Sequence, residues 1–77
     1  MKNYERERAF RHVLWTVGNP NGYEPGGFTK SLLEAWGRAD YANDARLSQA
    51  FPVLGEAIRM MKDLGVESVV KELKESS

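Results

Sequence analysis

The sequence predicts an all-α fold, a single small domain of four or five short helices over residues 1–77. Apolar residues recur at the three- and four-residue spacing of helices, and glycine and proline separate the periodic segments. Alternating apolar strands are missing on both sides of the most turn-rich segment. A hydrophobic fraction of 42% and a net charge of zero are typical of a folded domain and not of a disordered tail. The length allows one hydrophobic core.

The first helix is expected from about residue 3 to residue 17. Four apolar residues share one helical face: Phe10, Val13, Leu14 and Val17. Asn3 is a candidate N-cap, and Gly18 is a stop signal after the last apolar residue. Residues 18–27 contain four glycines and two prolines, which exclude a helix or a central strand. We expect this segment to be an ordered loop between two helices.

The second helix is expected over residues 28–39. Its predicted core face consists of Phe28, Leu32, Ala35 and Ala39, widened by Leu33 and Trp36. Asp40 is a cap or turn residue before a third helix over residues 42–51. The predicted core positions of that helix are Leu47, Ala50 and Phe51.

The fourth helix is expected to begin at Pro52, since proline suits the first helical position, and to end before Gly65. Its apolar positions are Leu54, Ala57, Ile58, Met61 and Leu64. A last helix over residues 66–75 repeats the pattern with Val66, Val69, Val70 and Leu73.

Several classes of function are unsupported by the residues present. The chain has no cysteine and one histidine, His12, and its carboxylates are not grouped at ligand spacing, so we expect no metal site, no catalytic residues and no cofactor. No apolar stretch approaches the roughly 20 residues that span a bilayer, so no membrane partner is expected. The lack of cysteine fits a reducing cytoplasm.

One stripe on the first helix carries a candidate binding site. Tyr4, Arg8, Arg11 and Trp15 fall within about 60° of helical arc beside the core face. Aromatic rings interleaved with arginines can stack on a base and hold a phosphate, and the same residues are typical of protein interfaces. Alternatively, the rings widen the core and the arginines form ion pairs. Tyr23, in the loop, is a further candidate contact.

The middle of the chain resembles a group of small bacteriophage and prophage proteins. The resemblance rests on the run Pro25-Gly26-Gly27-Phe28-Thr29-Lys30-Ser31-Leu32-Leu33-Glu34-Ala35, followed by Ala39-Asp40, Asn43, Arg46-Leu47 and Phe51-Pro52. It covers about half of the chain, from Pro25 to Ile58, and this chain departs from the pattern at Trp36-Gly37. The group has no established activity, so the resemblance implies a viral origin and an accessory role. Each motif residue also has a structural explanation as a core, cap or turn residue.

These observations lead to one main hypothesis and two alternatives. The main one is a non-enzymatic phage accessory protein, of counter-defence type, that binds or sequesters a host protein or a small signalling nucleotide in the host cytoplasm. The first alternative is a helix-turn-helix regulator that reads DNA with Asn43, Arg46 and Gln49, although residues 42–51 carry one basic and one acidic residue, which makes a nucleic-acid partner unlikely on charge. The second is a virion structural or assembly component. Because a core this small contributes little net stability, we also expect a homo-oligomer with Trp15 in its interface.

Overall fold

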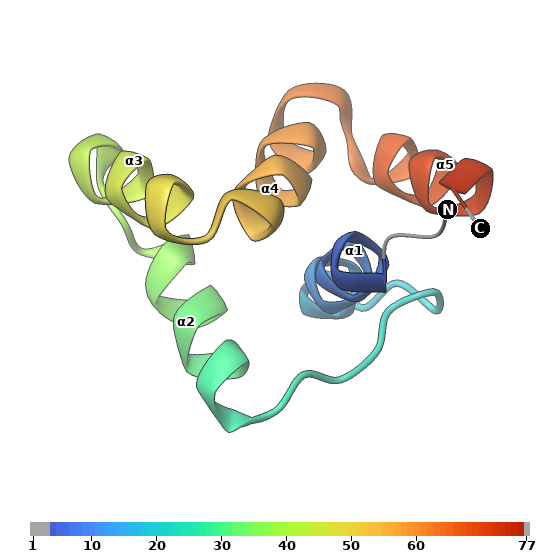
Figure 1. Ribbon diagram of the computed structural model, residues 1–77, viewed down its shortest axis with the longest axis horizontal. Coiled ribbons are helices and arrows are strands. Elements are labelled where there is room, and N and C mark those ends of the chain that lie inside the picture. Colours follow the sequence, from blue (N-terminus) through green and yellow to red (C-terminus); the bar gives the residue numbers. More distant parts are fainter. Residues whose placement is uncertain (1–3, 77) are drawn as a thin grey trace.

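The computed structural model describes residues 4–76, which form five helices and no strand (Figure 1). The helices are α1 Tyr4–Thr16, α2 Gly27–Gly37, α3 Tyr41–Ala50, α4 Pro52–Leu64 and α5 Val66–Ser76. The predicted all-α class and the five segments are confirmed, with bounds within two residues of those expected. None of the five is long and apolar enough to cross a membrane.

The core lies where α1, α4 and α5 pack against one another, and α2 and α3 form an arm beside it (Figure 1). The arm is attached through the packing of α3 on α4 and through two buried residues of α2, Leu33 and Trp36. The fully buried side chains of greatest volume are Trp36, Phe10, Leu14, Val13 and Val69. The helix α3 contributes no fully buried residue.

The predicted helix signals act as expected at four positions. Gly18 and Gly65 have positive φ angles of 72° and 91°, a conformation that glycine adopts without a steric penalty. Pro52 lies in the first turn of α4, where its missing N–H removes no helical hydrogen bond. The Asp40 side chain accepts a hydrogen bond from the backbone N–H of Asn43 at 2.8 Å and so caps α3. The predicted cap Asn3 lies outside the described residues.

The predicted core face of α2 is wrong at Phe28 and Ala35, while Leu32 is partly buried against the core as predicted. Phe28 is 71% exposed and Ala35 is exposed, whereas Leu33 and Trp36 are buried. The helix is therefore turned by about 100° from the predicted orientation. The reason is that an indole buries more apolar surface than any other side chain of this helix, so packing Trp36 determines which face turns inward. Phe28, in the first turn, instead packs its ring beside that of Phe51, with 6.2 Å between centroids.

Three further predicted core positions are also exposed. Val17 is 48% exposed because α1 ends at Thr16 and the chain turns away at Gly18. Leu64 is 71% exposed in the last turn of α4, and Ala50 is exposed at the end of α3. Each lies at a helix end, where the chain leaves the packed surface. The other predicted core residues of α1, α4 and α5 are buried or partly buried against the core.

One ionic contact joins the three core helices. The Arg6 guanidinium of α1 donates from Nε to Glu56 of α4 at 3.0 Å and from Nη2 to Glu72 of α5 at 3.0 Å. These carboxylates raise the pKa of Arg6, with its hydrogen bond to Glu56 as the largest cause. The guanidinium also lies 4.5 Å from the centre of the Phe10 ring. Arg6 therefore covers one edge of the core while pairing two helices.

Candidate functional site

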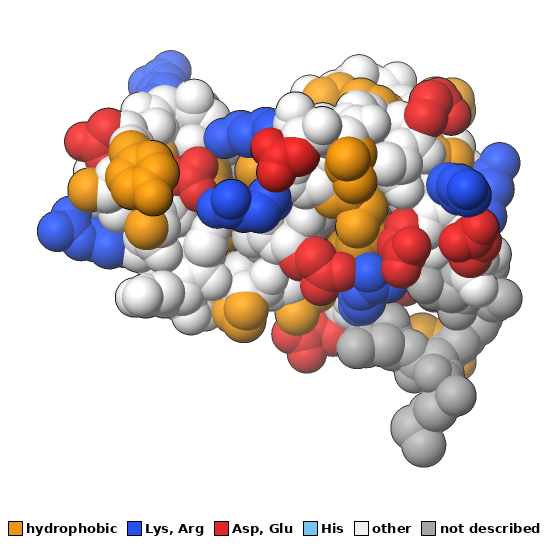
Figure 2. Space-filling model, turned by 90° about the horizontal axis from the view of Figure 1, so that it is seen from above, with side chains coloured by type: hydrophobic (Ala, Val, Ile, Leu, Met, Phe, Trp, Pro, Cys, Tyr) orange, Lys and Arg blue, Asp and Glu red, His pale blue; other side chains and the backbone are white. Residues whose placement is uncertain are grey.

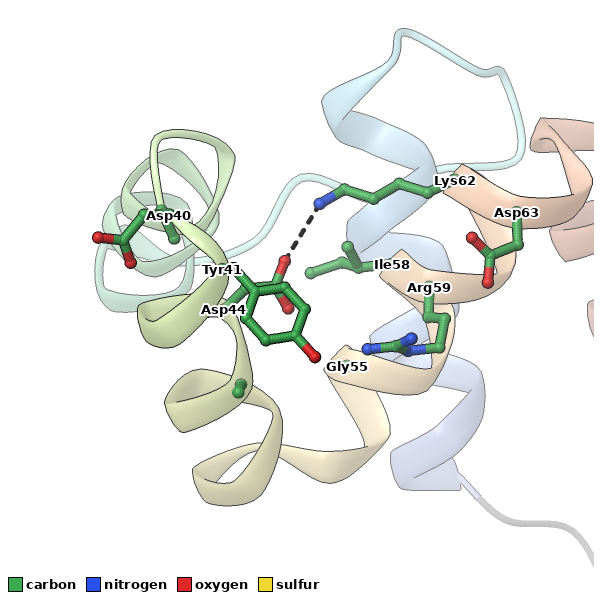
Figure 3. Close-up of a pocket in the computed structure, with 10 residues that line it drawn as sticks. Asp40, Tyr41, Asp44, Gly55, Ile58, Arg59, Lys62 and Asp63 are labelled. Carbon is green, nitrogen blue, oxygen red and sulfur yellow. Dashed lines mark hydrogen bonds and ion pairs between the residues drawn. The ribbon is translucent and has the colours of Figure 1, made fainter.

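A recess of about 270 Å³ lies between α3 and α4 (Figure 3). Ile58 and Gly55 of α4 line its apolar part. Its polar part holds Tyr41 of α3, the cations Arg59 and Lys62 of α4, and three carboxylates, Asp40, Asp44 and Asp63. The face that contains α3 and α4 carries acidic and basic side chains side by side, without a field of one sign (Figure 2). Which charged side chains of the recess can bind a ligand therefore depends on which of them already form ion pairs within the protein.

Asp44 is paired within the protein. Its carboxylate accepts hydrogen bonds from Lys62 Nζ at 3.2 Å and from Ser48 Oγ at 3.4 Å. The hydrogen bond from Lys62 is the main cause that lowers the pKa of Asp44, and Trp36 and Ser48 lower it further. The Trp36 Nε1 is buried and makes no hydrogen bond of standard geometry with the described residues. Its N–H still lies close enough to the Asp44 carboxylate to lower the pKa of Asp44. Asp44 thus joins α3 to α4 and faces the indole of α2.

Tyr41 and Arg59 are available to a ligand. The Tyr41 side chain is 92% exposed, and Arg59 makes no ion pair or hydrogen bond with any residue from 4 to 76. In Figure 3, Arg59 extends from α4 towards the Tyr41 ring of α3, while Asp40 points away from the recess. An exposed ring, an unpaired guanidinium and the apolar Ile58 together can bind a planar group that carries an anion.

The predicted stripe on α1 is divided by contacts within the chain. Arg11 pairs with Glu7 at 3.2 Å, donates to the Asn21 carbonyl at 3.0 Å and lies 4.4 Å from the centre of the Tyr23 ring. The Tyr23 backbone N–H donates to the Arg11 carbonyl at 3.1 Å. The structure therefore brings Arg11 and Tyr23 together, in a contact that attaches the loop to α1.

The other three stripe residues lie in different surroundings. Trp15 is 38% exposed, and Lys30 Nζ lies 5.4 Å from the centre of its ring. Tyr4 is 66% exposed. Arg8 is exposed and lies in a second recess, where its charge helps to lower the pKa of His12, after the larger effect of burial. A partner-binding role for the stripe stays a prediction.

The three residues predicted to read DNA are solvent-exposed. Three residues, 38–40, separate α2 from α3, and Asn43, Arg46 and Gln49 are all exposed. Arg46 Nη1 donates a hydrogen bond to Asn43 Oδ1 at 3.1 Å. These two side chains therefore pair with each other on the surface of α3. The connection has the length of a helix-turn-helix turn, but the charge of α3 remains low.

Within residues 4–76, the histidine and carboxylate side chains form no group of three that could hold a metal ion. The sequence matches no protein-family model, and comparison with curated proteins and with solved structures finds no match.

Sequence reasoning did not identify the α3–α4 recess. Tyr41 and Arg59 are 18 positions apart, and they meet only because α3 and α4 fold back on each other at Phe51. One signal was present in the sequence. Tyr41 is a large aromatic residue at the start of a helix whose other residues are mostly small or polar, and such a ring without an apolar partner is a candidate contact.

Proposed function

We propose that this chain is a small, non-enzymatic, phage-type accessory protein that sequesters a host signalling nucleotide, and that the α3–α4 recess is the binding site. A counter-defence role in the host cytoplasm is the physiological setting that this proposal implies. The observation that carries it is the pair of Tyr41 and Arg59, an exposed ring and an unpaired guanidinium over one recess.

The chemistry of the recess suits a nucleotide better than an arbitrary anion. A base can stack on the Tyr41 ring, and its phosphate can accept a bidentate hydrogen bond from Arg59. The apolar Ile58 behind them covers the edge of the base or sugar. Lys62 is held by Asp44 at 3.2 Å, so a second phosphate could compete with this carboxylate for its charge.

Isothermal titration calorimetry with mononucleotides, dinucleotides and cyclic dinucleotides tests the proposal. We expect at least one of them to bind with a dissociation constant of roughly 100 µM or tighter. Tyr41→Ala removes the stacking contact, worth about 1–3 kcal/mol, and should weaken binding about 5- to 150-fold. Tyr41→Phe keeps the ring and should bind nearly as well.

A matched control distinguishes the site from general attraction to positive charge. Arg59→Ala should weaken binding at least as much as Tyr41→Ala. Arg38→Ala, which removes an exposed cation at the C-cap of α2 that pairs with Glu34, should leave binding unchanged. Absence of heat with every nucleotide at millimolar concentration would contradict the nucleotide proposal. A protein captured specifically from host lysate would then favour the host-protein form of the hypothesis.

DNA binding is the second candidate function. It is favoured by the three-residue connection between α2 and α3 and by the exposure of Asn43, Arg46 and Gln49. Asp44 of α3 and its N-cap Asp40 oppose the approach of α3 to the phosphates of a DNA duplex. A gel shift on phage genomic DNA at low salt tests it, since specific reading through α3 requires binding that Arg46→Ala abolishes.

Self-association is a further part of the proposal. A homo-oligomer with Trp15 in the interface remains compatible with its 38% exposure, and Lys30 already covers part of the ring from within the chain. A role in the virion is tested by mass spectrometry of purified particles.

A further inference from the structure

A second recess of about 230 Å³ lies between α1 and the corner where α3 joins α4. The α1 wall consists of Glu5, Arg8, Ala9 and His12, and the opposite wall is mainly apolar and runs from Ala50 to Leu54, with Thr29 at one end. We call this recess the α1 groove. It is separate from the α3–α4 recess, because the two share no lining residue.

A large apolar side chain projects beside the α1 groove. Phe28 is 71% exposed, and its ring packs beside that of Phe51. Phe51 lines the groove, and so does Thr29, the residue that follows Phe28. A protruding ring next to an apolar recess is self-complementary. A two-fold axis close to both features lets Phe28 of each copy enter the groove of the other, as an isologous interface requires.

The charges on the groove are self-complementary in the same sense. Glu5 and Arg8 make no ion pair or hydrogen bond within the described part of the chain, whereas their neighbours Arg6, Glu7 and Arg11 all do. Glu5 and Arg8 are three residues apart, about 4.5 Å along the helix axis. When two α1 helices meet antiparallel, Glu5 of each copy faces Arg8 of the other, so the Glu5–Arg8 pair forms twice, once on each side of the two-fold axis.

We infer that a second copy of this chain docks on the α1 groove, with the two α1 helices antiparallel, Phe28 of each copy in the groove of the other, and Glu5 paired with Arg8 across the two-fold axis. This inference rests on the proposed self-association and assigns it to a face other than the one around Trp15. A stable dimer buries about 800 Å² and about 20–30 residues per partner, and the residues that line the groove are fewer than that. We therefore expect a dimer with a micromolar dissociation constant.

The first test is sedimentation velocity on the full chain from 1 to 300 µM, with the Phe28→Asp and Leu64→Asp variants beside it. Leu64 is the matched control because it is also 71% exposed, at the far end of α4. The wild type should reach twice the 8.7 kDa mass of one chain. Phe28→Asp should weaken dimerisation at least tenfold, and Leu64→Asp should leave it unchanged.

The second test uses charge exchange, which does not depend on the apolar contact of Phe28. Glu5→Arg and Arg8→Glu should each form dimers at least tenfold more weakly than the wild type. An equimolar mixture of the two should form a heterodimer in native mass spectrometry, because each charge then meets its opposite. Circular dichroism confirms that both variants keep their helices.

The possible failures are distinguishable. A wild type that stays monomeric at 300 µM overturns both the inference and the proposed self-association. A wild-type dimer that Phe28→Asp does not weaken, or two charge variants that do not form a heterodimer, overturns the α1 groove as the interface. If Trp15→Ala then dissociates that dimer, self-association stands on the face first proposed. Nucleotide binding at the α3–α4 recess is unaffected by any of these outcomes.

Discussion

Gly22, in the loop over residues 18–26, lies directly against the backbone of α1. A Cβ atom at this position would lie 2.5 Å from the Cα of Trp15 and 2.8 Å from the carbonyl carbon of Leu14, and closer still to the Trp15 nitrogen. These atoms are helix backbone and cannot rotate away. Gly22 does not have a positive φ angle, so its own backbone conformation would accept alanine. The substitution Gly22→Ala therefore tests contact alone.

The cost of Gly22→Ala follows from the contacts that attach the loop. The Asn19 N–H donates to the Leu14 carbonyl at 3.1 Å, the Tyr23 N–H donates to the Arg11 carbonyl at 3.1 Å, and Arg11 Nη1 donates to the Asn21 carbonyl at 3.0 Å. Moving the loop outward breaks two or three of these bonds, each worth about 1 kcal/mol net. We expect a loss of about 2–3 kcal/mol, which is a large part of the roughly 3–5 kcal/mol available to a core of this size.

Urea unfolding followed by tryptophan fluorescence measures this loss. With a slope of about 1 kcal/mol per molar urea, the midpoint should fall by about 2–3 M. Gly27→Ala is the control, since a Cβ at that position meets no atom within 4 Å and alanine favours the first turn of α2. The close-contact reasoning is refuted if Gly22→Ala stays within about 0.5 kcal/mol of the wild type, or if Gly27→Ala destabilises the protein equally.

Three further predictions concern the contacts between helices and the one histidine. Arg6→Met keeps the aliphatic stem on Phe10 but removes the ion pairs with Glu56 and Glu72. The unfolding free energy should fall by about 1 kcal/mol, and this difference from the wild type should shrink in 1 M salt. A difference that grows with salt would contradict an ionic origin. Asp40→Ala removes the α3 cap and should cost about 1 kcal/mol in urea unfolding, with Asp40→Asn close to the wild type. Burial and the charge of Arg8 lower the pKa of His12 below its usual 6.5. The folded state therefore binds fewer protons than the unfolded chain once His12 begins to titrate. The unfolding free energy is unaffected by His12 above pH 6.5 and decreases as the pH falls below that value. The melting temperature should therefore decrease between pH 7.5 and 5.5, and His12→Gln should flatten this dependence; an equal slope in the variant would assign it to other groups.

Helix positions in this chain follow from local chemistry, which explains why they could be predicted. Gly18, Pro52 and Gly65 act through their own backbone conformation, and Asp40 acts on an N–H three residues away. These effects require no knowledge of distant parts of the chain. The buried faces of α1 and α5 were also predictable, since the aliphatic residues of each helix recur at helical spacing on one face.

The orientation of α2 and both recesses depend on distant contacts and could not be predicted in this way. In α2, Phe28 and Trp36 lie on different faces, and the choice between them depends on the space left by α1 and α4. The docking of Gly22 on Trp15 is a contact between a loop and helix backbone that no periodicity reports. The stripe on α1 was predicted from spacing that correctly places its residues on one helix, but spacing could not show that Arg11 already binds the loop.

The pairing of charges in the described residues separates folding from binding. Arg6 joins α1 to α4 and α5, and Lys62 joins α4 to α3, so their substitution should lower stability. Arg8 and Arg59 make no ion pair with any residue from 4 to 76, and each lies at a recess that has an exposed aromatic ring beside it. An exposed arginine without a partner adds little to folding. Loss of Arg59 should therefore weaken ligand binding, and loss of Arg8 should weaken dimerisation, each at unchanged unfolding free energy.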